Sequence, residues 1–371
     1  MKIFKKILSK YSRVLLLLLI IAVLAVLKPE AFWNWSNITT VVFQQAPFTM
    51  LMSFGMTLAI ITKGIDKSMG SVLVLSNVIA ATLVKNNQIL LGVMVALAIG
   101  IVCGVCNGLL ITKAGIPPFV ATYGIDFIAL GLAYVYTGGV SIYGFSDSFR
   151  KISTFSIGGI TSLAVITFVI LLGLQFMMSC TTFGRGIFST GTNFNATVLS
   201  GIDAGKTIII VYVINGILAA VTGILYMARL NAADPGISGN FTLDSIAATL
   251  IGGNSFIGGE GSIANAAVGA LIIVFIRNGM NILGVETTWQ QAAIGFVILA
   301  SIGKEERLII ITLIIQTSGQ PRTNCAVLQK SWRNGSIREA EKPSYASQWP
   351  DFQQTARQTE FSMNRKQTGS L

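Results

Sequence analysis

Long apolar runs follow one another between residues 14 and 303, and charged residues stand almost only between them. Each run approaches the roughly 20 apolar residues that a helix needs to cross the hydrocarbon core of a bilayer. Only 11% of the 371 residues are charged, whereas a typical soluble protein has about 25%. Such a chain cannot present a hydrated surface on all sides. The sequence therefore predicts a membrane protein with no large soluble domain.

The apolar runs predict an all-α, polytopic fold of about ten transmembrane helices. The eighth run is short and rich in glycine, so we expect a broken or tilted helix there. The predicted crossings are residues 14–32, 41–62, 69–84, 89–112, 117–137, 161–179, 207–228, 245–257, 262–281 and 289–303. Residues 1–13 are basic, as in a signal peptide, but no clean cleavage site follows. We therefore expect an uncleaved first helix.

The distribution of Lys and Arg predicts the orientation of these helices. We assume that the N-terminal segment, residues 1–13, is cytoplasmic. Twelve of the 26 Lys and Arg residues then fall in inner segments and six in outer segments, and the other eight lie beyond residue 317. Cytoplasmic loops of membrane proteins carry the excess of these residues. The loop of residues 182–206 is then cytoplasmic. Trp33 and Trp35 suit the outer interface, where an indole ring keeps its N–H in water.

The composition argues against several classes of function. The chain has no histidine, which removes the commonest general base and a favoured zinc ligand. Cys103 and Cys106 form a C-x-x-C within an apolar run, and we interpret them as small, buried helix residues. No Ser–Lys or paired-aspartate arrangement supports an intramembrane enzyme. The net charge of +11 is spread between apolar runs, which is not typical of a nucleic-acid-binding surface. We expect no cofactor and no catalytic residue.

Three glycine-rich loops separate the apolar runs. GIDAGKT at residues 201–207 resembles a phosphate-binding loop, but it is one residue short and no strand precedes it. TKGIDKSMGS at residues 62–71 fits either a turn whose Asp66 caps the next helix or a broken helix near a transport path. The third loop, with Gly252, Gly253 and GGEGS at residues 258–262, fits a second glycine-rich hinge around Glu260, although close helix packing is the favoured role for most of its glycines. The hinge candidates in the last two loops are Gly64, Asp66, Gly70, Gly252 and Gly253.

Polar residues inside the predicted spans are costly in hydrocarbon and usually face the interior of the bundle. They are Gln44, Gln45, Asn77, Asn107, Asn215, Asn278 and Asn281. Amides both donate and accept hydrogen bonds, which suits hydroxylated, uncharged solutes such as sugars. We take five of them as substrate-path candidates: Gln44, Gln45, Asn77, Asn107 and Asn278. Asp126 is the only carboxylate that we place deep in a span, as a proton relay or as a paired structural group.

Five stretches in order carry a resemblance to a known family. They are QQAPFTMLMSFGMTLAIITKGIDKSMGS, NGLLITKAGIPPFVATYG, GRGIFSTGTNFNATVLSGI, LDSIAATLIGGNSFIGGEGSI and NGMNILGVETTWQQAAIGFVILA. Together they resemble the permease subunits of bacterial ABC importers for simple sugars, the ribose, xylose and autoinducer-2 branch of the branched-chain permease superfamily. The similarity covers about residues 37–300.

This resemblance implies that the chain lies in a bacterial inner membrane and works with several partner proteins. Two permease subunits form the path, a cytoplasmic ABC ATPase drives it, and an extracytoplasmic binding protein delivers the sugar. The permease itself is not an enzyme. The loop of residues 180–206 resembles the coupling loop that docks on the ATPase. There, glycines can punctuate a short helix and Asn193 can cap it. The coupling-loop candidates are Gly184, Arg185, Gly191, Asn193, Ala196, Ser200 and Gly201.

The sequence departs from this family pattern at three places. Lys67 and Asp126 stand where the family usually has apolar or small residues. Beyond the transmembrane domain of residues 14–303, the family resemblance is lost, and residues 304–371 form a polar tail that we expect to be disordered. We interpret this tail as a frameshifted or misjoined end. A proton-coupled secondary sugar carrier that uses Asp126 is the alternative to an ATP-driven importer.

Overall fold

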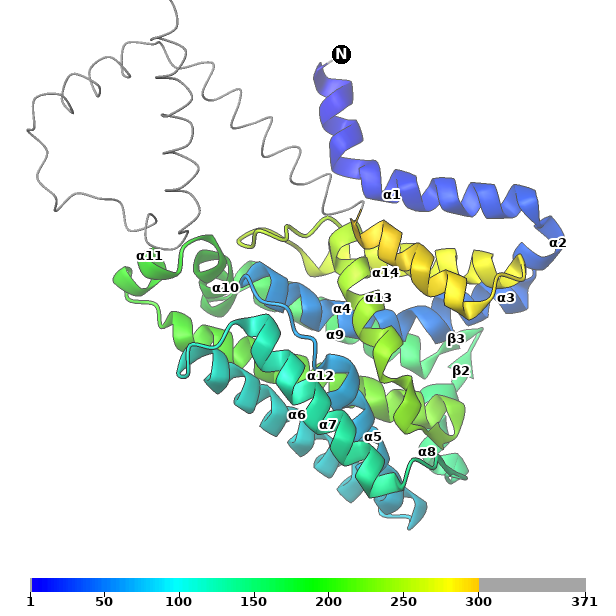
Figure 1. The fold of residues 1–371 in the computed structure, drawn as a ribbon. Helices are drawn as coiled ribbons and strands as arrows, with labels where there is room; N and C mark the ends of the chain where they lie inside the picture. The colour runs from blue at the N-terminus through cyan, green and yellow to red at the C-terminus, as the bar shows by residue number, and fades with distance from the viewer. Residues whose placement is uncertain (1, 300–371) are drawn as a thin grey trace, which may run out of the picture. The chain divides into compact units, whose positions relative to one another are not determined.

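The computed structural model describes residues 2–299, and this part of the chain contains ten helical segments that correspond to the predicted crossings (Figure 1). This confirms the predicted all-α fold of about ten helices. The second crossing consists of three consecutive pieces, α3 (Trp35–Thr40), the π-helical turn η1 (Val41–Gln45) and α4 (Ala46–Ile61). The other crossings are α1 (Lys2–Leu27), α5 (Met69–Lys85), α6 (Ile89–Thr112), α7 (Pro118–Thr137), α9 (Ser162–Cys180), α12 (Ala204–Leu230), α13 (Ser238–Ile251), α14 (Ile263–Ile282) and helical residues 287–299. The predicted tail lies outside the described residues.

Short elements gather at the two ends of these helices. One end, called here the α8 end, holds α2 (Pro29–Phe32), α8 (Asp147–Thr154), η2 (Pro235–Ile237) and two antiparallel strand pairs. The pairs are β1 (Ile142–Tyr143) with β4 (Ala232–Ala233), and β2 (Ser156–Ile157) with β3 (Ile160–Thr161). The opposite end, called the α10 end, holds α10 (Thr182–Thr192), α11 (Phe194–Leu199) and the loops of residues 62–68 and 252–262. Loops predicted to share one side of the membrane therefore lie at one end.

The eighth crossing differs from its prediction. The sequence predicts residues 245–257, but α13 spans Ser238–Ile251 and the following glycines form a loop. Gly253 has a φ of +76°, a conformation that ends helices and favours glycine. The shift places Asp244 inside a helix, where its carboxylate accepts hydrogen bonds of 2.9 and 2.6 Å from Arg277 of α14. The prediction that Asp126 is the only deep carboxylate is therefore wrong.

Close helix contacts in the bundle depend on glycine. Gly100, Gly104 and Gly108 recur every fourth residue on α6, and this face lies against α12. A β-carbon at Gly100 would overlap the Gly216 carbonyl, and one at Gly104 would overlap the Tyr212 carbonyl. Small residues at this spacing let two backbones approach in lipid, where van der Waals packing drives association. The largest described contact between helices, α6 on α12, therefore has a simple sequence cause.

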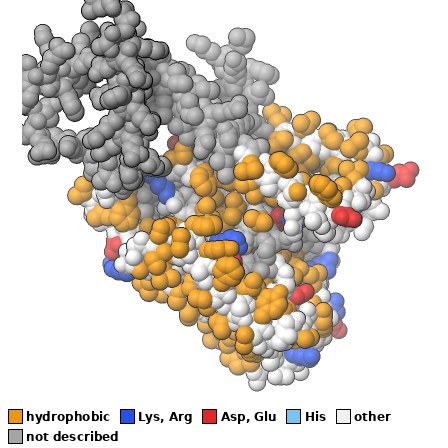
Figure 2. All heavy atoms as spheres, viewed as in Figure 1, with side chains coloured by type: hydrophobic (Ala, Val, Ile, Leu, Met, Phe, Trp, Pro, Cys, Tyr) orange, Lys and Arg blue, Asp and Glu red, His pale blue; other side chains and the backbone are white. Residues whose placement is uncertain are grey.

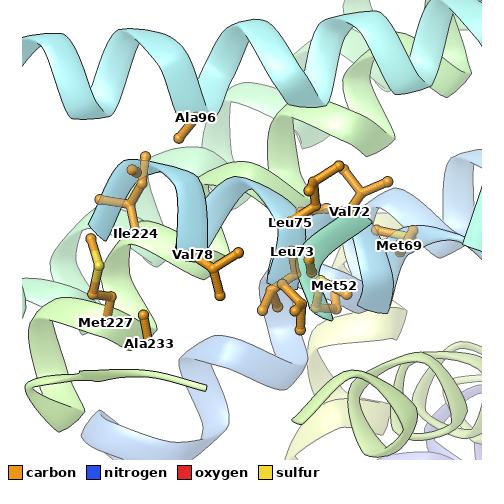
Figure 3. Close-up of a cluster of buried hydrophobic side chains, with 14 of the residues drawn as sticks. Met52, Met69, Val72, Leu73, Leu75, Val78, Ala96, Ile224, Met227 and Ala233 are labelled. Carbon is orange, nitrogen blue, oxygen red and sulfur yellow. The ribbon is translucent and has the colours of Figure 1, made fainter. Parts of the chain in front are cut away.

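The core surrounds α5, and the outer helices expose their apolar faces. Figure 3 shows a cluster that includes Met52, Leu73, Val78 and Met227, contributed by α4, α5 and α12. By contrast, α6, α7 and α9 are long and apolar enough to cross a membrane and are mostly unburied in the single chain. Figure 2 shows hydrophobic side chains across most of the visible face, with scattered charged ones. Cys106 is exposed on α6, which corrects its predicted burial.

Candidate functional site

The loop between α9 and α12 folds into two short helices because each has a side-chain cap. The Thr181 hydroxyl oxygen accepts the Gly184 N–H at 3.1 Å and begins α10. The Asn193 side-chain oxygen accepts the Ala196 N–H at 3.0 Å and begins α11, as predicted. Such caps satisfy N–H groups that have no partner within the helix. Asp203 caps α12 through the Lys206 N–H at 2.9 Å, and this bond lowers the pKa of the exposed Asp203 carboxyl.

The coupling-loop candidates divide into buried glycines and exposed residues. Gly184 and Gly191 are buried, whereas the exposed ones are Arg185, Asn193, Ala196, Ser200 and Gly201. The exposed surface also includes an apolar patch formed by Phe194, Val198 and Leu199, with Leu199 88% exposed. The sequence analysis missed this patch. The predicted cap at Asn193 could have found it, because it fixes the register of α11 and puts Phe194 and Val198 on one face.

Gly191 lies in a junction of three segments at the α10 end. A β-carbon on Gly191 would overlap the carbonyl oxygen of Ile61, the last residue of α4. That oxygen accepts the Gly259 N–H at 2.8 Å. The Lys63 ammonium group donates to the Thr192 carbonyl oxygen at 3.1 Å. The end of α10, the end of α4 and the loop between α13 and α14 are therefore joined directly.

The turn after α4 contains a buried carboxylate. Asp66 is 2% exposed. Its Oδ1 accepts the Ser68 N–H at 3.1 Å and the Ser68 hydroxyl at 2.7 Å, and its Oδ2 accepts the Asn215 amide at 3.2 Å. The Asn107 amide donates to the Ser68 hydroxyl oxygen at 2.8 Å. Burial raises the pKa of Asp66, and the hydrogen bonds from Ser68 and Asn215 oppose that rise. Ser68 is the N-cap residue of α5 and no side chain caps that helix, so the prediction that Asp66 caps it is wrong. Asp66 instead fixes the turn before α5 through Ser68 and reaches α12 through Asn215.

The remaining hinge candidates are packed tightly. A β-carbon at Gly64 would overlap the Tyr212 hydroxyl, and one at Gly252 would overlap the Asn265 carbonyl. The Gly70 N–H donates to the Thr242 hydroxyl oxygen at 3.1 Å. The Gly253 carbonyl oxygen accepts a bond from the Arg13 guanidinium at 3.0 Å. Gly252 therefore marks a close contact between backbones, which fits the packing interpretation of its loop, whereas Gly64, Gly70 and Gly253 contact side chains.

The five substrate-path candidates do not converge on one another. Gln44 contacts the Arg229 guanidinium near the α8 end, and Gln45 is exposed. Asn278 exchanges hydrogen bonds with Asn37 at 2.8 and 3.4 Å. Asn77 and Asn107 are buried among α5, α6 and α12, and neither amide atom of Asn77 has a hydrogen-bond partner. A groove of about 400 Å³ beside α9 is lined almost entirely by apolar side chains, including Val42, Met50 and Phe168, and offers a sugar few hydrogen bonds.

The two charged departures from the family pattern contact each other. The Lys67 ammonium group lies 3.0 Å from the Asp126 carboxylate. No pattern in the sequence predicts this contact, because 58 residues and two helices separate the two positions. Asp126 is thus paired, one of the two roles that the sequence left open.

The fold and its loops define a polytopic helical membrane protein with a compact loop junction at the α10 end. Residues 38–302 match the family described as "Branched-chain amino acid transport system / permease component". The match covers more than half of the chain, and the chain belongs to this family.

The curated relatives that the chain matches include permeases of sugar transport systems. The chain is 36% identical to the D-allose transport system permease protein of Escherichia coli K12, over 81% of this chain and 92% of the relative. It is also 36% identical to the ribose import permease protein of the same strain, over 80% and 93%. The ribose import permease protein of Bacillus subtilis is 34% identical, over 81% and 93%. The resemblance to sugar-importer permeases is confirmed. No solved structure matches the chain.

Proposed function

We propose that the chain is the membrane-spanning subunit of an ATP-driven importer for a simple sugar. Two copies, or one copy and a related subunit, would form the path, and an extracytoplasmic binding protein would deliver a pentose or hexose. A separate cytoplasmic ABC ATPase would hydrolyse ATP. The names of the relatives support a sugar of the ribose, allose or galactose class. The N-terminus and the α10 end would face the cytoplasm.

The junction at the α10 end is the observation that carries this proposal. The α10–α11 segment (Thr182–Leu199) presents an exposed patch at Phe194, Val198 and Leu199. Clusters of large apolar side chains on a water-exposed surface are typical of protein interfaces. Through Gly191 and Thr192 the same segment contacts α4 and the loop between α13 and α14. A docked ATPase that rotates would therefore displace helices beyond α9 and α12, and so shift the population between inward-open and outward-open states.

A proton-coupled carrier is the second candidate, and it depends on Asp126. That carboxylate is held by Lys67 at 3.0 Å. The pairing favours the importer, because an ion pair that joins two elements has a structural role without any proton transfer.

Uptake by proteoliposomes separates the two candidates. The chain, its copurifying ATPase and its binding protein are reconstituted, and uptake of radiolabelled ribose, allose and galactose is measured at constant internal ATP. We expect uptake of at least one of these sugars to persist when a protonophore collapses the proton gradient, and to stop when the ATPase is omitted. Uptake that needs the proton gradient and survives loss of the ATPase would reject the importer.

A further inference from the structure

The Lys67–Asp126 pair joins the turn after α4 to α7. The two side chains are 22% and 12% exposed, so the pair is largely shielded from water. Among the side chains that the structure describes there are four ion pairs, and two of these are local pairs three residues apart on exposed surface. Lys67–Asp126 and Asp244–Arg277 are the two that connect different elements. Shielded pairs of this kind couple positions more strongly than exposed pairs.

Three residues in the first turns of α7 contact the turn of residues 62–68. The Thr122 hydroxyl oxygen accepts the Lys67 N–H at 3.1 Å and lies 3.1 Å from the Ile65 carbonyl oxygen. The Lys67 ammonium group stands over the Tyr123 ring, 5.7 Å from its centroid. Asp126, one helical turn beyond Thr122, completes the contact. The attachment of α7 at this end is therefore polar and directional.

The other side of the same short turn touches the α10–α11 segment. Lys63, four residues before Lys67, donates to the Thr192 carbonyl oxygen. Between them, Asp66 is fixed to α12 through Asn215. Backbone hydrogen bonds from Lys63 to Ile60 and from Gly64 to Ala59 hold the start of the turn on α4. Each of residues 62–68 takes part in at least one hydrogen bond, so a displacement at Lys63 can pass along the turn to Lys67.

We propose that the Lys67–Asp126 pair makes α7 part of the unit that the ATPase moves, with the turn of residues 62–68 as the link. This inference rests on the proposed function. Lys67 and Asp126 act as positioning residues: neither needs to touch the sugar. When the α10–α11 segment is displaced, the link pulls the α10 end of α7 with it. Without the pair, ATP hydrolysis continues while α7 follows less completely.

The test compares sugar transported per ATP hydrolysed in reconstituted complexes. Asp126→Asn and Lys67→Met each remove one charge, and Lys67→Glu/Asp126→Lys reverses the pair. Asp147→Asn breaks an exposed local pair at the α8 end and serves as the matched control. We expect each single variant to lower the ratio by about fivefold or more, the lower end of ordinary coupling between sites. The reversed pair should restore most of the ratio, and the control should match the wild type.

A purely structural pair gives a different result. In that case the single variants lose thermal stability, but the folded complexes transport the wild-type amount of sugar per ATP; this outcome would overturn the inference. Hydrogen exchange provides a readout that does not depend on transport. Adding the ATPase to the full-length chain should change the exchange of residues 118–126 in the wild type and much less in Asp126→Asn. An equal change in both proteins would also overturn it. Absence of ATP-driven uptake in the wild type would reject the proposed function alone.

Discussion

Gly191→Leu is expected to abolish sugar uptake while the ATPase continues to hydrolyse ATP and the chain still inserts into the membrane. A β-carbon at this position would overlap the Ile61 carbonyl oxygen and lie 2.7 Å from the Gly259 nitrogen. Both neighbours are backbone atoms, so they cannot rotate away as a flexible side chain would. Overpacking of this kind costs about 1–3 kcal/mol. We therefore expect the junction to open and uptake to fall by more than about tenfold.

Gly173→Leu supplies the control for that experiment. Gly173 lies in α9, and nothing stands within 4 Å of a β-carbon built there. The control should insert and transport like the wild type. Membrane insertion is followed by the amount of chain in the membrane fraction, and coupling by uptake and ATP hydrolysis in the same vesicles. Normal transport by Gly191→Leu would mean that the junction does not carry the movement of the ATPase.

Arg277→Met is expected to lower the free energy of unfolding by about 3–5 kcal/mol, because it leaves the Asp244 carboxylate buried without its partner. Arg277 binds both oxygens of Asp244 through two hydrogen bonds, at 2.9 and 2.6 Å. The double variant Asp244→Leu/Arg277→Met removes both charges and should recover most of the loss. Thermal unfolding in detergent micelles measures each change.

A local pair provides the comparison for this second experiment. Lys206 and Asp203 are three residues apart, and both are largely exposed. Lys206→Met should leave the unfolding temperature nearly unchanged, because water and salt screen such pairs. If Arg277→Met unfolds at the wild-type temperature, the pair does not stabilise the contact between α13 and α14.

Apolar runs predict the helices well because a segment that crosses lipid must hydrogen-bond its own backbone N–H and C=O groups, and a helix does so. Free N–H groups at the start of a helix also need partners, which is why Asn193 could be recognised as a capping residue. Helix ends inside glycine-rich stretches could not be placed. α13 ends at Ile251, and its C-cap Gly252 still has a φ of −56°, whereas Gly253 has a φ of +76°. This difference depends on a φ angle that the residue type allows but does not require.

Contacts between residues far apart in the chain could not be predicted from the sequence. Lys67 and Asp126 could each be recognised as unusual, but their contact depends on how α7 lies against the turn after α4. Asp244 was missed because the predicted crossing begins at residue 245, seven residues after the start of α13 and directly after Asp244. The patch on α11 was missed for another reason: it depends on the register of α11, in which the cap at Asn193 leaves Phe194 and Val198 exposed.

ATP-driven import requires that the α10–α11 segment lies in the cytoplasm and binds a separate ATPase. A photo-crosslinking amino acid is therefore placed at position 199 in intact cells, where Leu199 is 88% exposed. We expect a covalent adduct with the ATPase subunit, and no such adduct when the same amino acid replaces Trp35 at the α8 end. An adduct with an extracytoplasmic protein at position 199, or an ATPase adduct at position 35 instead, would show that the segment does not bind the ATPase.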